Sequence, residues 1–190
     1  AVSIAAGYGK LTGKPAAALV HNVVGTMHAS MAIYDAYVGK TPMIVMSGTG
    51  PMSMDGRRPW IDWVHTALVQ GNLVRDFVKF DDQPHDTFSV PESFVRAYRV
   101  AMTEPKGPVY IALDAGWQEE RIDRDIPIPD VAKFAPPAPV QGDPAALAQT
   151  AKLLASARTP LIIAGRVGRA PSAVADLIKL AETGGIKVVD

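Results

Sequence analysis

The stretch that decides the fold is AAALVHNVVGTMH, residues 16–28. Its first five residues are apolar, as in a buried strand, and the strand ends at His21. A short turn through Gly25 follows, and apolar residues then recur at helical spacing from Met27 to about Val38. A strand that passes into a helix in this way places its last side chains at the carboxyl edge of a sheet, where open α/β sheets bind ligands. His21 is therefore a candidate for chemistry, because a histidine changes charge near neutral pH.

Strands and helices alternate through the rest of the first 114 residues. The predicted elements are a helix over residues 1–11, a strand over 43–46, a short strand around 77–79, a helix behind 89–92 and a strand over 109–113. Continuous apolar strands that alternate with helices are typical of a parallel sheet covered by helices on both faces. We therefore predict an α/β fold. Gly7 and Gly9 inside the first helix suggest close packing or a bend there.

A proline-rich stretch divides the chain. It holds prolines 127, 129, 136, 137 and 139 and is typical of a linker, which we place at residues 115–142. Asp143 and Pro144 then have the pattern of an N-cap followed by a first-turn proline. We predict a domain over 1–114 that lacks its N-terminal part, and the beginning of a second, Rossmann-like α/β domain over 143–190. Both chain ends look like interrupted elements, the last of them a strand over 186–190, so we expect a piece of a longer protein.

Composition argues against several kinds of partner. Lys+Arg and Asp+Glu both number 19, so the net charge is zero and no nucleic-acid partner is indicated. The chain has no cysteine, which excludes disulfides, thiolate metal sites and a cysteine nucleophile, and this fits a cytoplasmic protein. No run of about 18 apolar residues suggests a membrane span.

Three further histidines have to be weighed beside His21. His28 lies on the helix after it, and His65 lies behind an irregular loop over 49–60; each can face a ligand or pack on a helix surface. A loop of that length after a strand is often functional. His85 lies in a polar turn and is interpreted as solvated surface. The acidic residues around His85 match no metal-ligand spacing, so we predict no metal site in this chain.

The order of these motifs resembles the pyrimidine-binding domain of thiamine-diphosphate-dependent enzymes. The resemblance is carried by AGYGKLTGKP (6–15), the strand and turn through Gly25, PMIVMSG (42–48), Val78-Lys79, Arg96-Ala97 and GPVYI (107–111), and it enters the family's central domain at 160–165. Within the family, His21 resembles the active-site histidine of the benzoylformate decarboxylase branch, where acetolactate synthases usually carry a small hydroxyl residue. His28 stands where the family commonly has Asn, and Thr49 stands where many members have Gln.

The resemblance implies a cofactor and a set of site residues. Thiamine diphosphate carries the hard chemistry, in which it attacks a 2-oxo acid and carbon dioxide leaves. His21 would orient the substrate carboxylate or relay a proton. The residues that would line the aminopyrimidine through their backbone are Val23, Val24, Gly25, Thr26 and Met27. The candidates for the substrate pocket are His28, Thr49 and His65.

The same resemblance implies that part of the active site lies outside this chain. The family's glutamate that bonds the aminopyrimidine would fall just before Ala1. The diphosphate and Mg²⁺ ligands belong to the family's third domain. We therefore expect the 190 residues alone to be inactive. Family active sites form between two subunits, which implies a homodimer or homotetramer.

Several functions stay open at this stage. The first is a benzoylformate-decarboxylase-like 2-oxo acid decarboxylase or carboligase, a lyase or transferase. Its rival is an acetolactate-synthase-like carboligase, which would take pyruvate and allow FAD on the central domain; no motif supports FAD, and His21 argues against this rival. A different class is a non-catalytic oligomerisation or binding domain. A nicotinamide-binding domain is disfavoured, because the glycines at Gly165 and Gly168 lack the G-x-G-x-x-G spacing.

Overall fold

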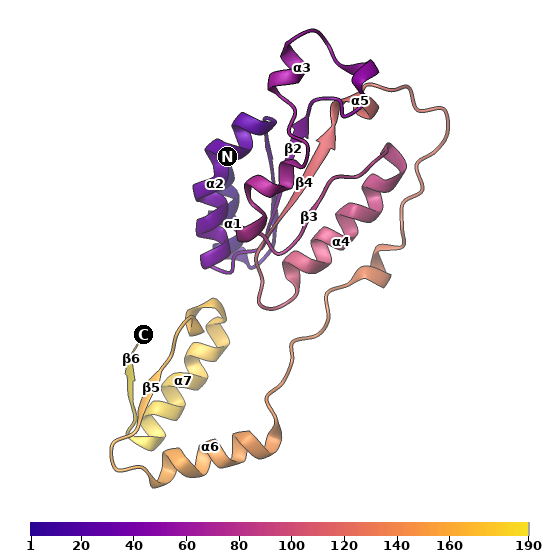
Figure 1. Ribbon diagram of the computed structural model, residues 1–190. Helices are drawn as coiled ribbons and strands as arrows, with labels where there is room; N and C mark the ends of the chain where they lie inside the picture. The colour runs from indigo at the N-terminus through magenta and orange to yellow at the C-terminus, as the bar shows by residue number, and fades with distance from the viewer. Residues whose placement is uncertain (190) are drawn as a thin grey trace. The chain divides into compact units, whose positions relative to one another are not determined.

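The computed structural model describes residues 1–189 and divides into two compact units, residues 1–137 and the residues from 138 onward (Figure 1). The predicted boundaries at residues 114 and 142 stay a prediction. The predicted last strand included Asp190, which lies outside the described residues. Among the described residues, no helix combines the length and apolar character needed to cross a bilayer.

The first unit is built on a four-stranded parallel sheet. Its strands, in spatial order, are β1 (Ala16–Val20), β2 (Met43–Thr49), β4 (Pro108–Asp114) and β3 (Asp81–Asp82). Three long helices cover it: α1 (Val2–Thr12), α2 (Val23–Val38) and α4 (Val90–Met102). Shorter turns of helix connect the rest: η1 (Met54–Gly56), α3 (Ile61–Val64), η2 (Gln70–Leu73), η3 (Arg75–Phe77), η4 (Thr87–Ser89), α5 (Ala115–Gln118) and η5 (Val131–Phe134).

Successive side chains of β4 point to opposite faces of the sheet, and their packing shows that helices cover both faces. Tyr110 and Ala112 join the core that α1 and α2 close. Val109 and Ile111, which point the other way, pack with α4. The predicted α/β fold, a parallel sheet with helices on both faces, is confirmed.

β1 is an edge strand, and this limits its burial. Ala18 is buried beneath α1 and α2, but Leu19 on the opposite face is 66 % exposed. The expectation of a fully buried strand is therefore only half right. The reason is that α4, the helix on that second face, packs mainly over β4 and β2.

The predicted strand around residues 77–79 is displaced. Residues Arg75–Phe77 form η3, and β3 begins at Asp81. The Phe77 ring packs edge-on against Tyr34, with ring centroids 5.1 Å apart, and so turns toward α2 rather than into the sheet. Pairing with β4 begins only beyond it, where the Lys79 N–H donates to the Pro108 carbonyl at 2.8 Å.

The second unit contains two helices and a two-stranded parallel sheet. Its elements are α6 (Pro144–Ser156), β5 (Leu161–Ile163), η6 (Val167–Arg169), α7 (Pro171–Gly184) and β6 (Lys187–Val189). The predicted N-cap is confirmed, since Asp143 Oδ2 accepts from the Ala146 N–H at 2.7 Å. Among the described residues of this unit, Ile186 is the one buried apolar side chain.

Candidate functional site

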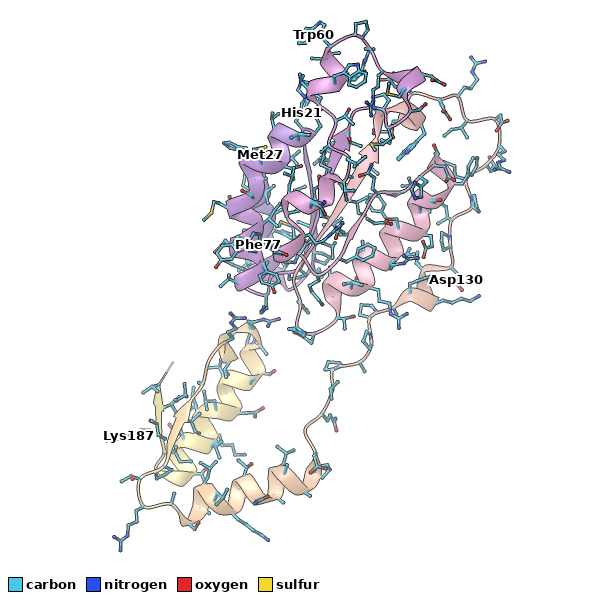
Figure 2. All side chains as sticks on the ribbon, in the orientation of Figure 1. His21, Met27, Trp60, Phe77, Asp130 and Lys187 are labelled. Carbon is cyan, nitrogen blue, oxygen red and sulfur yellow. The ribbon has the colours of Figure 1, made fainter. Side chains whose placement is uncertain are left out.

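His21 lies between the end of β1 and the start of α2, at the carboxyl edge of the first sheet (Figure 2). α2 already begins at Val23, so the predicted turn through Gly25 is in fact the first helical turn. A Cβ atom on Gly25 would lie 2.9 Å from His21 Cβ and 3.3 Å from Val20 Cβ. Glycine is required here because only its bare backbone lets the helix start come this close to the strand end.

A cleft of about 310 Å³ opens beside this helix start. The residues that line it are Ala1, Val2, Ser3, Val20, His21, Gly25, His28, Ala29 and Ala32. Three of the residues singled out in the sequence, His21, Gly25 and His28, therefore share one cleft. Its walls are otherwise mostly small and apolar, and both histidines are exposed.

The other predicted site residues lie around this cleft rather than in it. Val24 and Met27 are exposed on α2, and Val23 is half-buried. Thr26 is fully buried, and its hydroxyl is within 3.0 Å of the Tyr110 hydroxyl. Thr49 ends β2 in a buried position, where its hydroxyl donates to the Gly50 carbonyl at 3.3 Å.

His65 comes from a different loop and meets His21 through Asn22. The two imidazole centroids are 5.4 Å apart, with the ring planes tilted by 49°. The Nδ1 atoms of His21 and His65 lie 2.6 Å and 2.9 Å from the Oδ1 position of Asn22. Asn22 occupies the N-cap position of α2 but makes no side-chain cap bond there. The sequence points to Asn22 only through its position next to His21.

The loop that carries His65 is held by an ion pair and by a close approach to β2. The Asp62 carboxylate accepts from the Arg58 backbone N–H at 2.7 Å and from Arg58 Nε at 3.0 Å. The hydrogen bonds from Arg58 lower the pKa of Asp62 below its ordinary value. The Gly50 N–H donates to the His65 carbonyl at 3.3 Å, and a Cβ atom on Gly50 would overlap the Thr66 hydroxyl.

A buried polar cluster lies beneath the start of α2. The Tyr110 hydroxyl contacts the Ser47 hydroxyl and receives a hydrogen bond from Gln70 Nε2 at 2.8 Å. Gln70 Nε2 also lies 2.6 Å from Ser47 Oγ. With Thr26 bonded to the same tyrosine, this cluster ties α2 to β2, β4 and η2. The sequence did not reveal it, because Tyr110 reads as one apolar position of a strand.

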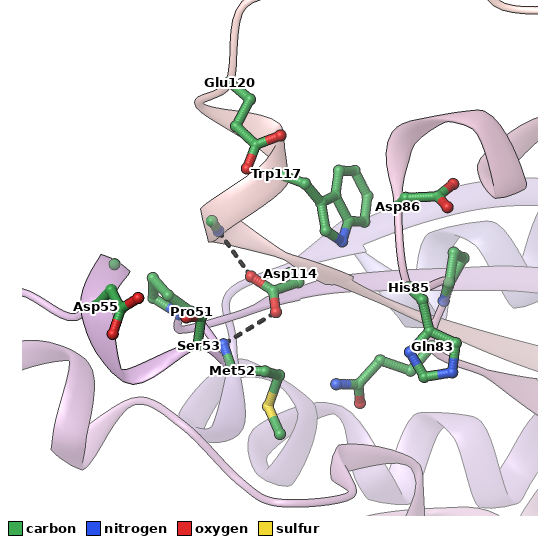
Figure 3. A pocket seen from close by; sticks show the side chains of 13 residues that line it. Pro51, Met52, Ser53, Asp55, Gln83, His85, Asp86, Asp114, Trp117 and Glu120 are labelled. Atoms are coloured by element: carbon green, nitrogen blue, oxygen red, sulfur yellow. Dashed lines mark hydrogen bonds between the residues drawn. The ribbon is translucent and has the colours of Figure 1, made fainter.

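A second pocket of about 590 Å³ opens at the ends of β2, β3 and β4 (Figure 3). Asp114 lies at its centre, where its carboxylate accepts from the backbone N–H groups of Met52 and Gly116 at 2.9 Å and 2.6 Å. His85, exposed as predicted, lines this pocket with Trp117. Among residues 1–189, no three His, Cys, Asp or Glu side chains are arranged to hold a metal ion.

With this geometry established, we compared the chain with known proteins. Residues 1–73 match the family described as "Thiamine pyrophosphate enzyme, N-terminal TPP binding domain". The matched residues include β1, His21, α2 and the whole of the loop that carries His65.

Relatives align over nearly the whole chain. A probable acetolactate synthase large subunit of Methanococcus aeolicus is 30 % identical over 190 residues, which are 99 % of this chain and 31 % of that protein. Benzoylformate decarboxylase of Pseudomonas aeruginosa is 25 % identical over 86 % of this chain and 30 % of its own length. The crystal structure of benzoylformate decarboxylase from Polynucleobacter necessarius superposes with a TM-score of 0.74 at 28 % identity, covering 95 % of this chain and 32 % of that one. The chain thus spans about a third of the length of these relatives.

Proposed function

We propose that this chain supplies one wall of a thiamine diphosphate site in a benzoylformate-decarboxylase-like 2-oxo acid decarboxylase or carboligase. The observation that carries the proposal is the shared cleft of His21, Gly25 and His28 at the start of α2. It lies within the stretch that matches the thiamine pyrophosphate family.

The cleft suits the flat, heteroaromatic aminopyrimidine. Its walls of alanine and valine offer apolar contact, and Gly25 leaves the backbone of the first helical turn open to close approach. The N–H groups of a first helical turn have no partner within their own helix, and Asn22 does not cap them. The backbone at Gly25 would therefore line the ring, whereas Val23, Val24, Thr26 and Met27 lie around the cleft and remain candidates for contact with the cofactor. When bound, thiamine diphosphate supplies the carbanion-stabilising chemistry; its diphosphate and Mg²⁺ would be held by a domain other than these two units.

The exposure of His21 at the cleft supports a role for it in acting on the substrate. It is exposed at the cleft, and no hydrogen bond of the described residues involves its Nε2. A neutral imidazole with a free Nε2–H can donate to a substrate carboxylate or carbonyl, and the imidazolium can return a proton to carbon. His28, on the same cleft, and Thr49 and His65 remain candidates for the substrate pocket.

The test is His21→Ala in a protein that carries this chain together with the diphosphate-binding domain. We expect the kcat for 2-oxo acid consumption to fall by about 10²-fold to 10⁴-fold, the usual contribution of a positioned acid or base. His85→Ala, a histidine outside the cleft, is the matched control. An unchanged rate in His21→Ala would refute the assignment.

An acetolactate-synthase-like carboligase is the second candidate, favoured by the 30 % identity to the Methanococcus aeolicus protein. The two candidates differ in their donor substrate. Benzoylformate and pyruvate, offered separately, distinguish them: release of benzaldehyde supports the first, and acetolactate formed from pyruvate supports the second.

We further propose that the chain assembles as a homodimer or homotetramer through α1 and α2. These helices expose large apolar side chains at helical spacing: Ile4, Tyr8 and Leu11 on α1, and Val24, Met27, Met31, Tyr34 and Val38 on α2. An exposed apolar stripe of this kind favours a protein interface, and Val24 and Met27 make it continuous with the cleft. Met31→Glu should convert the oligomer to monomer in light-scattering chromatography; an unchanged mass would contradict this.

A further inference from the structure

We propose that Asn22 and His65 are positioning residues that fix the ring of His21 and its neutral tautomer. The inference rests on the proposed catalytic role of His21 and assigns the two side chains that prepare it. A single asparagine amide bridges two Nδ1 atoms that come from two different loops.

A backbone hydrogen bond favours one of the two neutral tautomers of His21. The Asn22 N–H donates to His21 Nδ1 at 2.8 Å. A nitrogen that accepts a hydrogen bond has no proton of its own, so this contact favours the ring with its proton on Nε2, and the side-chain contact to the same Nδ1 is what completes the preference. Nε2 is then the atom left to face a ligand.

The orientation of the Asn22 side-chain amide has to be consistent with an unprotonated Nδ1 on His21. A carbonyl oxygen 2.6 Å from an unprotonated Nδ1 would bring two acceptors together. A half-turn of the amide places its NH₂ group at the same point without moving the backbone. That group has two hydrogens, which match the two Nδ1 atoms of His21 and His65. Both neutral rings are then held in the Nε2–H form.

His65 is what keeps the amide in place. An asparagine at an N-cap ordinarily turns its side chain to the N–H groups of its own helix. Here the side chain faces His65 instead, which arrives from a loop 43 positions further along the chain. The loop itself is pinned by the Asp62–Arg58 pair and by the hydrogen bond from Gly50 to the His65 carbonyl.

Removing His65 should therefore release the amide of Asn22 and loosen the ring of His21. The ring would keep the backbone bond to Nδ1 but lose the second donor. Asn22→Ala should have the same effect on the ring. His65→Gln retains an amide that can pair with Asn22, and so should restore most of the order.

The experiment reads the two nitrogens of His21 directly. Long-range ¹H–¹⁵N correlation spectra of the 190-residue chain at pH 8 should show His21 as the Nε2–H tautomer. In His65→Ala and Asn22→Ala, the nitrogen shifts should move toward the averaged values of a mixed tautomer. His65→Gln should return toward wild type, and His85→Ala should leave the spectrum of His21 unchanged.

The outcomes separate this inference from the proposed function. Unchanged His21 shifts in both alanine variants would overturn the positioning role, whatever the activity. In the protein that includes the diphosphate-binding domain, His65→Ala should lower kcat by about 10-fold with little change in KM, since the ring is misplaced but still present. If His21→Ala leaves the rate unchanged while the spectra shift as expected, the proposed function fails and the positioning contact stands.

Discussion

The two units use the same local signals and reach different degrees of burial. In residues 1–137, helices cover both faces of the four-stranded sheet except on the outer face of β1, and the core includes fully buried side chains such as Ile33, Met43 and Tyr110. In the described residues from 138 onward, two strands pair, but Leu161 and Ile163 of β5 stay exposed. Apolar patterning and caps are enough to form an element, whereas burial needs enough neighbouring elements to close a core.

The largest expected difference is in autonomous folding. Residues 1–137 expressed alone should unfold cooperatively on heating, because their sheet already has a buried core. Residues 138–190 expressed alone should show no cooperative transition, since an isolated two-stranded sheet is marginal at best. Circular dichroism during thermal unfolding checks both. A sharp transition in the shorter piece would show that the comparison is wrong.

A matched pair of core substitutions should sharpen the contrast. Ile33→Ala removes a fully buried side chain from α2 and should lower the free energy of unfolding by about 2–5 kcal/mol. Ile163→Ala removes a side chain that is 77 % exposed and should cost less than about 1 kcal/mol. Urea unfolding of the whole chain measures both. Equal losses would contradict the difference in burial between the two units.

Two glycines within α1 give the same contrast at a smaller scale. Gly9→Ala would bring a Cβ atom to 2.8 Å from the Pro42 carbonyl, and should destabilise the first unit by about 1–3 kcal/mol. Gly7→Ala meets nothing within 4 Å and should stabilise the helix by about 0.5–1 kcal/mol. Of the two expectations for these glycines, close packing or a bend, close packing is therefore confirmed at Gly9 and not found at Gly7. Chemical unfolding of the two variants should give shifts of opposite sign.

The smallest effect concerns the loop that carries His65. The pKa of Asp62 is lower in the folded state than in the unfolded chain. The stability that the ionised Asp62 carboxylate gives the folded loop is therefore present at neutral pH. It is lost as the pH falls from about 4 through the lower pKa of the folded state. The Trp63 indole resonance should therefore shift in acid before the core unfolds. Asp62→Asn should abolish this pH-dependent step in the Trp63 resonance, while Asp55→Asn in the preceding loop should preserve it. A step that survives in Asp62→Asn would assign it to another group.

The fold was predictable where apolar runs were continuous. Hydrophobic periodicity and capping residues predict β1, β2, β4 and the helices around them, because the local sequence of each element determines its type. β3 was misplaced because Asp81 and Asp82 carry no apolar signal, and their pairing is set by β4. The sequence also could not predict that one face of β1 is exposed, because the order of the strands in the sheet decides which strand lies at an edge.

The site was predictable only in part. The principle that ligands bind at the carboxyl edge of such a sheet drew attention to His21, and the structure brings His65 to it. Nothing in the sequence could show that Asn22 bridges the two rings, because that contact joins loops far apart in the chain. The same holds for Gln70, whose contacts with Ser47 and Tyr110 depend on the folded sheet.

The missing cap at Asn22 has a consequence for anyone who would engineer this protein for heat resistance. A capping serine or aspartate at position 22 would be an obvious choice, since a good N-cap stabilises a helix by about 1 kcal/mol. The melting temperature of such a variant would rise because the new side chain would bond to the start of α2, and it would then no longer contact His21 and His65. Design methods that score stability alone would accept it, and would lose the contact on which the histidine depends.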